Sequence, residues 1–138
     1  MLDLLAERGG GMDALAVAHL QRMKTGALIT WSLEAGAILG RAGEEQSAQV
    51  RAYGRCIGLA FQIADDLLDF EGDERSAGKR LGKDAARGKQ SFVSLLGAAR
   101  ARAQAEELAA EAVAHLRPFG ARGALLADLS RFVIRRDR

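Results

Sequence analysis

The sequence is poor in several residues that other protein classes depend on. It holds one cysteine and one proline in 138 residues, and only 5% of its residues are aromatic. The single cysteine, Cys56, excludes an intrachain disulfide framework and a cysteine-based zinc site. We expect it to be a small buried residue in a reducing compartment. Few aromatics and a net charge of +2 argue against nucleic-acid binding, which usually requires a dense cationic stripe interleaved with aromatic side chains.

Long apolar runs are also missing. None approaches the roughly 18 residues that a membrane span requires. Met1 leads straight into "LDLLAERGGG", which lacks the form of a cleavable signal peptide. We therefore expect one domain over residues 1–138, without a membrane span and located in the cytoplasm.

Alanine and leucine are abundant, whereas β-branched residues are sparse. This balance favours helix over strand along the whole chain and predicts an all-α helical bundle. Apolar periodicity predicts helices at 14–40, 44–71, 90–117 and 124–138. In the last helix, an apolar stripe is expected from Leu125, Leu129, Phe132 and Val133. Between the second and third helices, residues 71–89 are rich in glycine and charge. That composition predicts a long loop, and long loops inside compact domains are usually functional.

Three aspartates interrupt the apolar segment "GLAFQIADDLLDF" (58–70). At about 3.6 residues per turn, Gln62, Asp65, Asp66 and Asp69 fall within one arc of roughly 100°, and most apolar residues take the opposite side. Carboxylates this close repel one another unless a cation lies among them. Oxygen donors without histidine or cysteine suit Mg²⁺. The alternative is a solvated acidic face near a helix end.

The segment "GKRLGKDAARGK" (78–89) follows the aspartates closely. Its basic residues are Lys79, Arg80, Lys83, Arg87 and Lys89. Lysines on a glycine-rich segment beside a magnesium-type carboxylate cluster suit a diphosphate, because the metal bridges its oxygens on one side and ammonium groups neutralise the others. Taken alone, the segment is equally compatible with a solvated linker. The two features together favour the diphosphate site.

With these motifs the chain resembles the trans-isoprenyl diphosphate synthases of the polyprenyl synthetase family, closest to bacterial farnesyl diphosphate synthases (geranyltranstransferases). The matching stretches are "KTGALI" (24–29), "GLAFQIADDLLD" (58–69), "GKRLGKDAARGK" (78–89) with the following "SFVSLLG", and "FVIRRDR" near the C-terminus. The resemblance covers nearly the whole chain, and the order and spacing of the motifs also fit.

The resemblance implies a fold, a reaction and a set of site residues. The fold is the C-terminal half of an isoprenoid synthase bundle, and the reaction is Mg²⁺-dependent condensation of an allylic diphosphate with isopentenyl diphosphate. Metal binding is implied for Asp65, Asp66 and Asp69, and diphosphate binding for Lys24, Lys79 and Lys89. Lys24, Thr25 and Gln62 are the implied catalytic residues, with Thr25 and Gln62 near the reacting carbons. A hydroxyl bond from Thr25 to a carbonyl one turn back is expected to bend the helix at Gly26.

One departure from the family limits this interpretation. Family members carry two aspartate-rich motifs facing one cavity, whereas Asp65, Asp66 and Asp69 form the only DDxxD here. Met1 aligns with the middle of a family chain, so the partner is expected to be a missing N-terminal half or a second copy in a homo-oligomer such as a dimer. Two alternatives remain: a non-catalytic helical subunit that binds a partner synthase, or a truncated, inactive fragment. A helical domain with a fortuitous acidic face is a third. His19 and His115 are expected to lack a carboxylate or a second histidine at ligand spacing, and to be structural or exposed.

Overall fold

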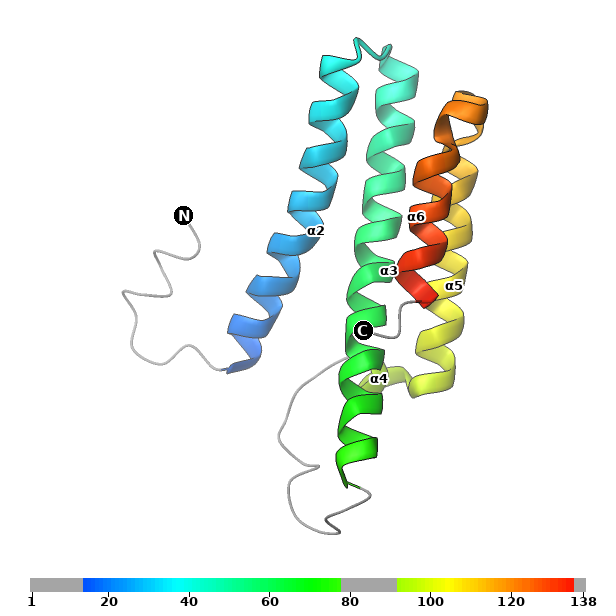
Figure 1. Ribbon diagram of the computed structural model, residues 1–138. Helices are drawn as coiled ribbons and strands as arrows, with labels where there is room; N and C mark the ends of the chain where they lie inside the picture. Colours follow the sequence, from blue (N-terminus) through cyan, green and yellow to red (C-terminus); the bar gives the residue numbers. More distant parts are fainter. Residues whose placement is uncertain (1–13, 78–91, 136–138) are drawn as a thin grey trace, which may run out of the picture.

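The computed structural model describes residues 14–77 and 92–135, which form a helical bundle (Figure 1). The elements in chain order are α2 (Ala14–Leu39), α3 (Glu44–Ala77), α4 (Phe92–Leu96), α5 (Ala98–His115), the 3₁₀ helix η1 (Arg117–Gly123) and α6 (Ala124–Arg135). Helix α3 is central: α2 runs antiparallel along one side, and α5 and α6 pack on the other. These described residues contain no strand, so the predicted all-α class is confirmed.

Small residues allow α5 to pack closely on α3. Its buried residues are Ala101, Ala105, Ala109 and Ala112. Their spacing of three or four residues places them on one helix face. Opposite them, α3 contributes the larger buried side chains, among them Ile57 and Ile63. The core is therefore asymmetric, with methyl groups on α5 and bulky apolar groups on α3.

A buried polar contact joins α3 to α6. The side chains of Tyr53 and Ser130 are fully buried. The Tyr53 hydroxyl donates to the Leu126 carbonyl at 2.8 Å, and the Ser130 hydroxyl donates to the Tyr53 hydroxyl oxygen at 3.2 Å. Since buried polar groups are costly without partners, these bonds fix how α6 is rotated against α3.

That rotation corrects the predicted stripe of the last helix. Val133 is buried, but Leu125 is 80% and Phe132 63% exposed, and Leu129 is also exposed. The core-facing row instead contains Ser130 and Val133, three residues apart. Two apolar rows exist on this helix, and the row that includes the hydrogen-bonding Ser130 faces the core.

Two predicted helix boundaries are also wrong. Helix α3 continues to Ala77, so the expected loop begins later than residue 71. The predicted helix over 90–117 is broken into α4 and α5 at Gly97, whose φ of 80° is not helical and is readily adopted by glycine. Among the described helices, none combines the length and the apolar character needed to cross a lipid bilayer.

Candidate functional site

Helices α2 and α3 come close together at two glycines of α3. A Cβ atom added to Gly58 would lie 3.3 Å from the Gly26 Cα, and one added to Gly54 would lie 3.2 Å from the Thr30 Cα. The two backbones can approach this closely only because these α3 positions carry no side chain. The two glycines of α3 therefore decide where the "KTG" segment of α2 is placed.

Gln62 lies at this crossing. A Cβ atom added to Gly26 would be 3.3 Å from Gln62 Nε2. Thr25 is half-buried beside Gly26, so the structure brings two residues with an implied catalytic role to the same part of the helix pair. A hydroxyl bond of the kind expected for Thr25 is made by Thr30, whose Oγ1 donates to the Gly26 carbonyl at 3.0 Å. The same bond at Thr25 stays a prediction.

An open groove of about 500 Å³ follows the crossing between α2 and α3. This volume falls in the range of small-molecule sites. Its lining residues are Met23, Gly26, Ala27, Thr30, Trp31, Glu34, Gly54, Arg55, Gly58, Leu59 and Gln62. Most of the lining is apolar. Gln62 lies at the end nearer the aspartates, because α3 continues from it to Asp65, whereas Glu34 and Arg55 lie at the other end.

The three aspartates differ in their surroundings. Asp65 and Asp69 are exposed, one helical turn apart on α3, which makes their side chains neighbours. Asp66 is only 6% exposed. Its Oδ2 accepts a hydrogen bond of 2.9 Å from the backbone N–H of Phe92, the first residue of α4. The predicted single acidic face is therefore divided: two carboxylates point to solvent and one anchors a neighbouring element.

The predicted cationic residues are only partly described. Lys24 is exposed on α2, two residues before Gly26. Lys79 and Lys89 lie outside the described residues. The Asp66–Phe92 bond nevertheless fixes where the chain enters α4, three residues after Lys89 in the sequence.

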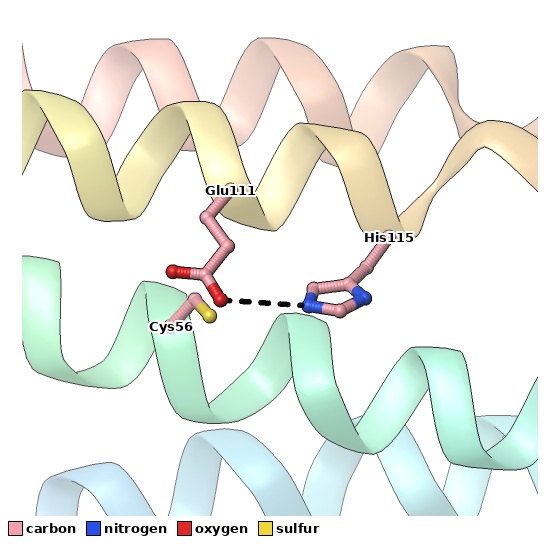
Figure 2. A group of neighbouring side chains, drawn as sticks. All are labelled: Cys56, Glu111 and His115. Carbon is pink, nitrogen blue, oxygen red and sulfur yellow. Dashed lines mark ion pairs between the residues drawn. The ribbon is translucent and has the colours of Figure 1, made fainter.

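The structure also brings together a group that the sequence interpretation missed. His115 was expected to lack a carboxylate at ligand spacing, but Glu111 precedes it by four residues, and Glu111 Oε1 lies 4.0 Å from His115 Nε2. Cys56 of α3 joins them, and all three donor atoms lie within 4.8 Å of one another (Figure 2). Cys56 is half-buried, not fully buried as expected. The i, i+4 spacing of Glu111 and His115 was a usable signal, whereas the approach of Cys56 depends on helix packing.

The chain matches known proteins over most of its length. The polyprenyl synthetase family model covers residues 1–118. A chloroplastic geranylfarnesyl diphosphate synthase from Leucosceptrum canum is 40% identical over 129 residues, which is 93% of this chain and 35% of the relative. A dimethylallyltranstransferase from Fischerella ambigua is 37% identical over 134 residues, or 97% of this chain and 39% of the relative.

Solved structures agree with these relatives. An FPP/GFPP synthase from Zymomonas mobilis, determined in its apo form, superposes with a TM-score of 0.70 at 44% identity, over 95% of this chain and 42% of that one. A putative farnesyl-diphosphate synthase from Marinomonas sp. MED121 gives a TM-score of 0.67 at 30% identity, over 94% and 43%. The chain thus has the helical fold of these synthases and spans about a third to two fifths of the length of its relatives. It belongs to the polyprenyl synthetase family.

Proposed function

We propose that this chain forms one wall of the active site of a Mg²⁺-dependent trans-prenyltransferase. The reaction would join an allylic diphosphate to isopentenyl diphosphate, as in farnesyl diphosphate synthases. The observation that carries the proposal is the crossing of α2 and α3, where Gly26 meets Gly58 and Gln62. Lys24 and Thr25 directly precede Gly26 on α2, and this proximity supports a role for them beside Asp65 and Asp69.

The donor set fits magnesium. Mg²⁺ is usually held by one or two carboxylates, with water and phosphate oxygens completing its shell. Asp65 and Asp69, exposed one turn apart, supply such carboxylates. Asp66 would assist from a buried position while its Oδ2 holds α4. When bound, Mg²⁺ would neutralise the charge that develops on a departing diphosphate.

Lysine side chains would provide the remaining neutralisation. Lys24 would bind the allylic diphosphate from α2, and Lys79 and Lys89 from the segment between α3 and α4. As the allylic C–O bond breaks, the electron pair leaves on the diphosphate. The double bond of isopentenyl diphosphate then attacks the resulting cation, and loss of a proton restores a double bond. Fixed cationic groups favour the first step because they are already oriented toward the charge that forms.

The groove would hold the prenyl chain. It extends from the Gln62 end past Met23 and Leu59 to Trp31. An apolar lining keeps water from the reacting cation, provided that the open side is covered. We propose that this cover consists of further helices, from additional sequence or from a second chain, since Leu28, Trp31 and Ile38 are exposed on α2. A homo-oligomer such as a dimer is one way to supply them.

Two finer assignments also belong to the proposal. A farnesyl-type product is proposed from the sequence motifs, although the matched relatives are named for several products, including geranylfarnesyl and geranylgeranyl diphosphate. A cytoplasmic location is also proposed, because the single cysteine suits a reducing compartment, although some of the matched relatives are named as chloroplastic.

The direct test measures the coupling of Mg²⁺ to diphosphate. Inorganic diphosphate is titrated calorimetrically into the chain with and without Mg²⁺, and each ligand should tighten the other, because coupling between two sites is reciprocal. Asp65→Ala and Lys24→Ala should each weaken diphosphate binding in the presence of Mg²⁺ by roughly tenfold, the loss of one charge-assisted contact.

Asp128→Ala is the matched control. Asp128 is an exposed carboxylate on α6 that pairs only with its own helix in the described contacts, through Arg131. This variant should bind diphosphate as the parent chain does. If Asp65→Ala and Lys24→Ala bind like this control, the site assignment is wrong, and a non-catalytic helical subunit becomes the better interpretation.

A further inference from the structure

A second group of metal-ligating side chains lies on the other side of α3, away from the groove. Cys56 of α3 faces Glu111 and His115 of α5 (Figure 2). The Cys56 Sγ, a carboxylate oxygen of Glu111 and an imidazole nitrogen of His115 all lie within 4.8 Å of one another. The groove lies between α2 and α3, so this cluster shares no residue with it.

The histidine is already oriented for coordination. Its Nδ1 lies 2.7 Å from Gln49 Oε1. An amide oxygen can only accept, so this contact favours the tautomer with the proton on Nδ1, in which the lone pair is on Nε2. Nε2 is the atom that faces Glu111, at 4.0 Å. A metal-ligating histidine almost always donates its other N–H to an oxygen in this way, which fixes both tautomer and ring orientation.

The expectation that one cysteine excludes a cysteine-based zinc site holds for sites built from several thiolates, but not for one thiolate beside a histidine and a carboxylate. The three donors differ in chemistry from the aspartate site. A thiolate and an imidazole are borderline or soft ligands and favour Zn²⁺, whereas carboxylate oxygens alone favour Mg²⁺. Around tetrahedral zinc the donor atoms lie roughly 3.3–3.7 Å apart. Small side-chain rotations would bring the observed cluster to that spacing. Glu111 has a side chain that is 61% exposed, so the open side of the cluster can supply water as a fourth ligand.

We propose that Cys56, Glu111 and His115 bind a divalent cation of the Zn²⁺ class, with Gln49 orienting His115. Binding replaces the thiol proton, which passes to the buffer. The ion cross-links α3 to α5 at a position separate from the proposed magnesium site. Without a metal, the Cys56 thiol donates to the Glu111 carboxylate, and burial together with that carboxylate raises the pKa of the thiol.

Cobalt(II) provides the test, because its spectrum identifies its ligands. The reduced chain of 138 residues is titrated with Co²⁺ while the absorbance is recorded. We expect a thiolate-to-cobalt charge-transfer band in the near ultraviolet that saturates at one equivalent and disappears when Zn²⁺ is added. Because the protein has one cysteine, this band can arise only from Cys56.

Variants separate the cluster from other metal sites. Cys56→Ser should abolish the charge-transfer band. Glu111→Gln, an exposed substitution that preserves shape, should weaken cobalt binding by roughly tenfold or more. Glu106→Gln is the matched control, since this exposed acid is turned about 140° from Glu111 on the same helix. Asp65→Asn should also leave the band unchanged.

Thermal unfolding gives a second readout. Zn²⁺ should raise the melting temperature of the parent chain and of Glu106→Gln, but not of Glu111→Gln, because only binding to the folded state stabilises it. Absence of the charge-transfer band at millimolar Co²⁺ would overturn the proposal. So would unchanged cobalt affinity in Glu111→Gln.

Discussion

Among single residues, the neighbouring aspartates 65 and 66 show how one helical step changes the function of a side chain. Asp65 is exposed, whereas Asp66 is buried and accepts the Phe92 N–H at 2.9 Å. Tyr53 is a second example: its ring is fully buried, and its hydroxyl contacts both Leu126 and Ser130. In both cases the side chain hydrogen-bonds to a residue far away in the sequence and so joins two helices.

Removal of the Asp66 carboxylate should destabilise the fold. Asp66→Ala removes the part-buried hydrogen bond between the Phe92 N–H and the carboxylate, and the loss of a hydrogen bond to a charged group costs about 1–3 kcal/mol in the free energy of unfolding. Asp65→Ala, at an exposed position, should change it by less than about 0.5 kcal/mol. Urea unfolding followed by circular dichroism measures both. Equal losses in the two variants would show that the Phe92 bond does not stabilise the fold.

Tyr53 should make the fold sensitive to alkali. Burial raises the pKa of its phenol above the ordinary 10.0, and the Ser130 hydrogen bond lowers it by a smaller amount. The folded state thus holds its proton more tightly than the unfolded state. The stability from the neutral phenol is fully present below pH 10, and it is lost as the pH rises through the raised value.

The sequence makes this measurable, because Tyr53 is the only tyrosine. Phenolate absorbance and helical circular dichroism, followed in one alkaline titration, should change together above pH 10. Tyr53→Phe should remove the part of the alkaline destabilisation that comes from the phenol. The part that comes from the Cys56 thiol, whose pKa is also raised by burial, should remain. A phenolate that forms near pH 10 with the helices intact would contradict the prediction.

Between elements, the contact of α2 with α3 determines the candidate site. It depends on Gly54 and Gly58, at which an added Cβ atom would come within 3.2–3.3 Å of the α2 backbone. Gly36 of α2 differs, because a Cβ atom there would meet nothing within 4 Å. Among the described helical glycines, Gly54 and Gly58 therefore pack against the α2 backbone, whereas Gly36 packs against nothing.

Alanine substitution should distinguish these classes. Gly58→Ala forces the two helices apart and should cost about 1–3 kcal/mol in the free energy of unfolding, as overpacking does. It should also weaken diphosphate binding, since Lys24 moves with α2. Gly36→Ala should stabilise the chain by up to about 1 kcal/mol through helix propensity. Chemical denaturation measures the stabilities, and stabilisation by both substitutions would disprove the close approach.

At the scale of the whole molecule, α2 carries an exposed apolar surface. Leu28, Trp31 and Ile38 are each more than 60% exposed, and Leu39 is 84% exposed. Large exposed apolar surfaces in folded proteins usually mark interaction sites. This surface adjoins the groove that would require covering for prenyl transfer, so association and catalysis should depend on the same residues.

We therefore expect residues 1–138 alone to associate and to show no useful prenyl transfer. The carboxylates of one helix can hold about one Mg²⁺ ion, which would neutralise a diphosphate from one side only. Each 1.4 kcal/mol of lost transition-state stabilisation is roughly tenfold in rate. Gel filtration should show oligomers, and addition of the part of a related synthase that this chain does not match should restore Mg²⁺-dependent turnover. Robust turnover by a monomer would overturn this expectation.

Trp31 reports on that association. It is the only tryptophan, so its fluorescence should shift to longer wavelength on dilution, as the surface of α2 becomes solvated. Trp31→Ser should reduce the oligomer fraction. Leu125→Ser, at an exposed apolar position on α6, is the matched control. If only the α6 variant dissociates the oligomer, the interface lies on α6 instead.

The sequence by itself determined the all-α class, the first residues of α2, α3 and α6, and the family, because these depend on local propensity and on short motifs. It also indicated that Gln62, Asp65 and Asp69 share one face of a helix, since helical periodicity relates residues on one element. It could not indicate that Asp66 is buried, that Ser130 selects the core-facing row of α6, or that Cys56 reaches Glu111 and His115. Those outcomes depend on how α3 packs against α4, α5 and α6, and packing brings together residues that no spacing along one helix relates.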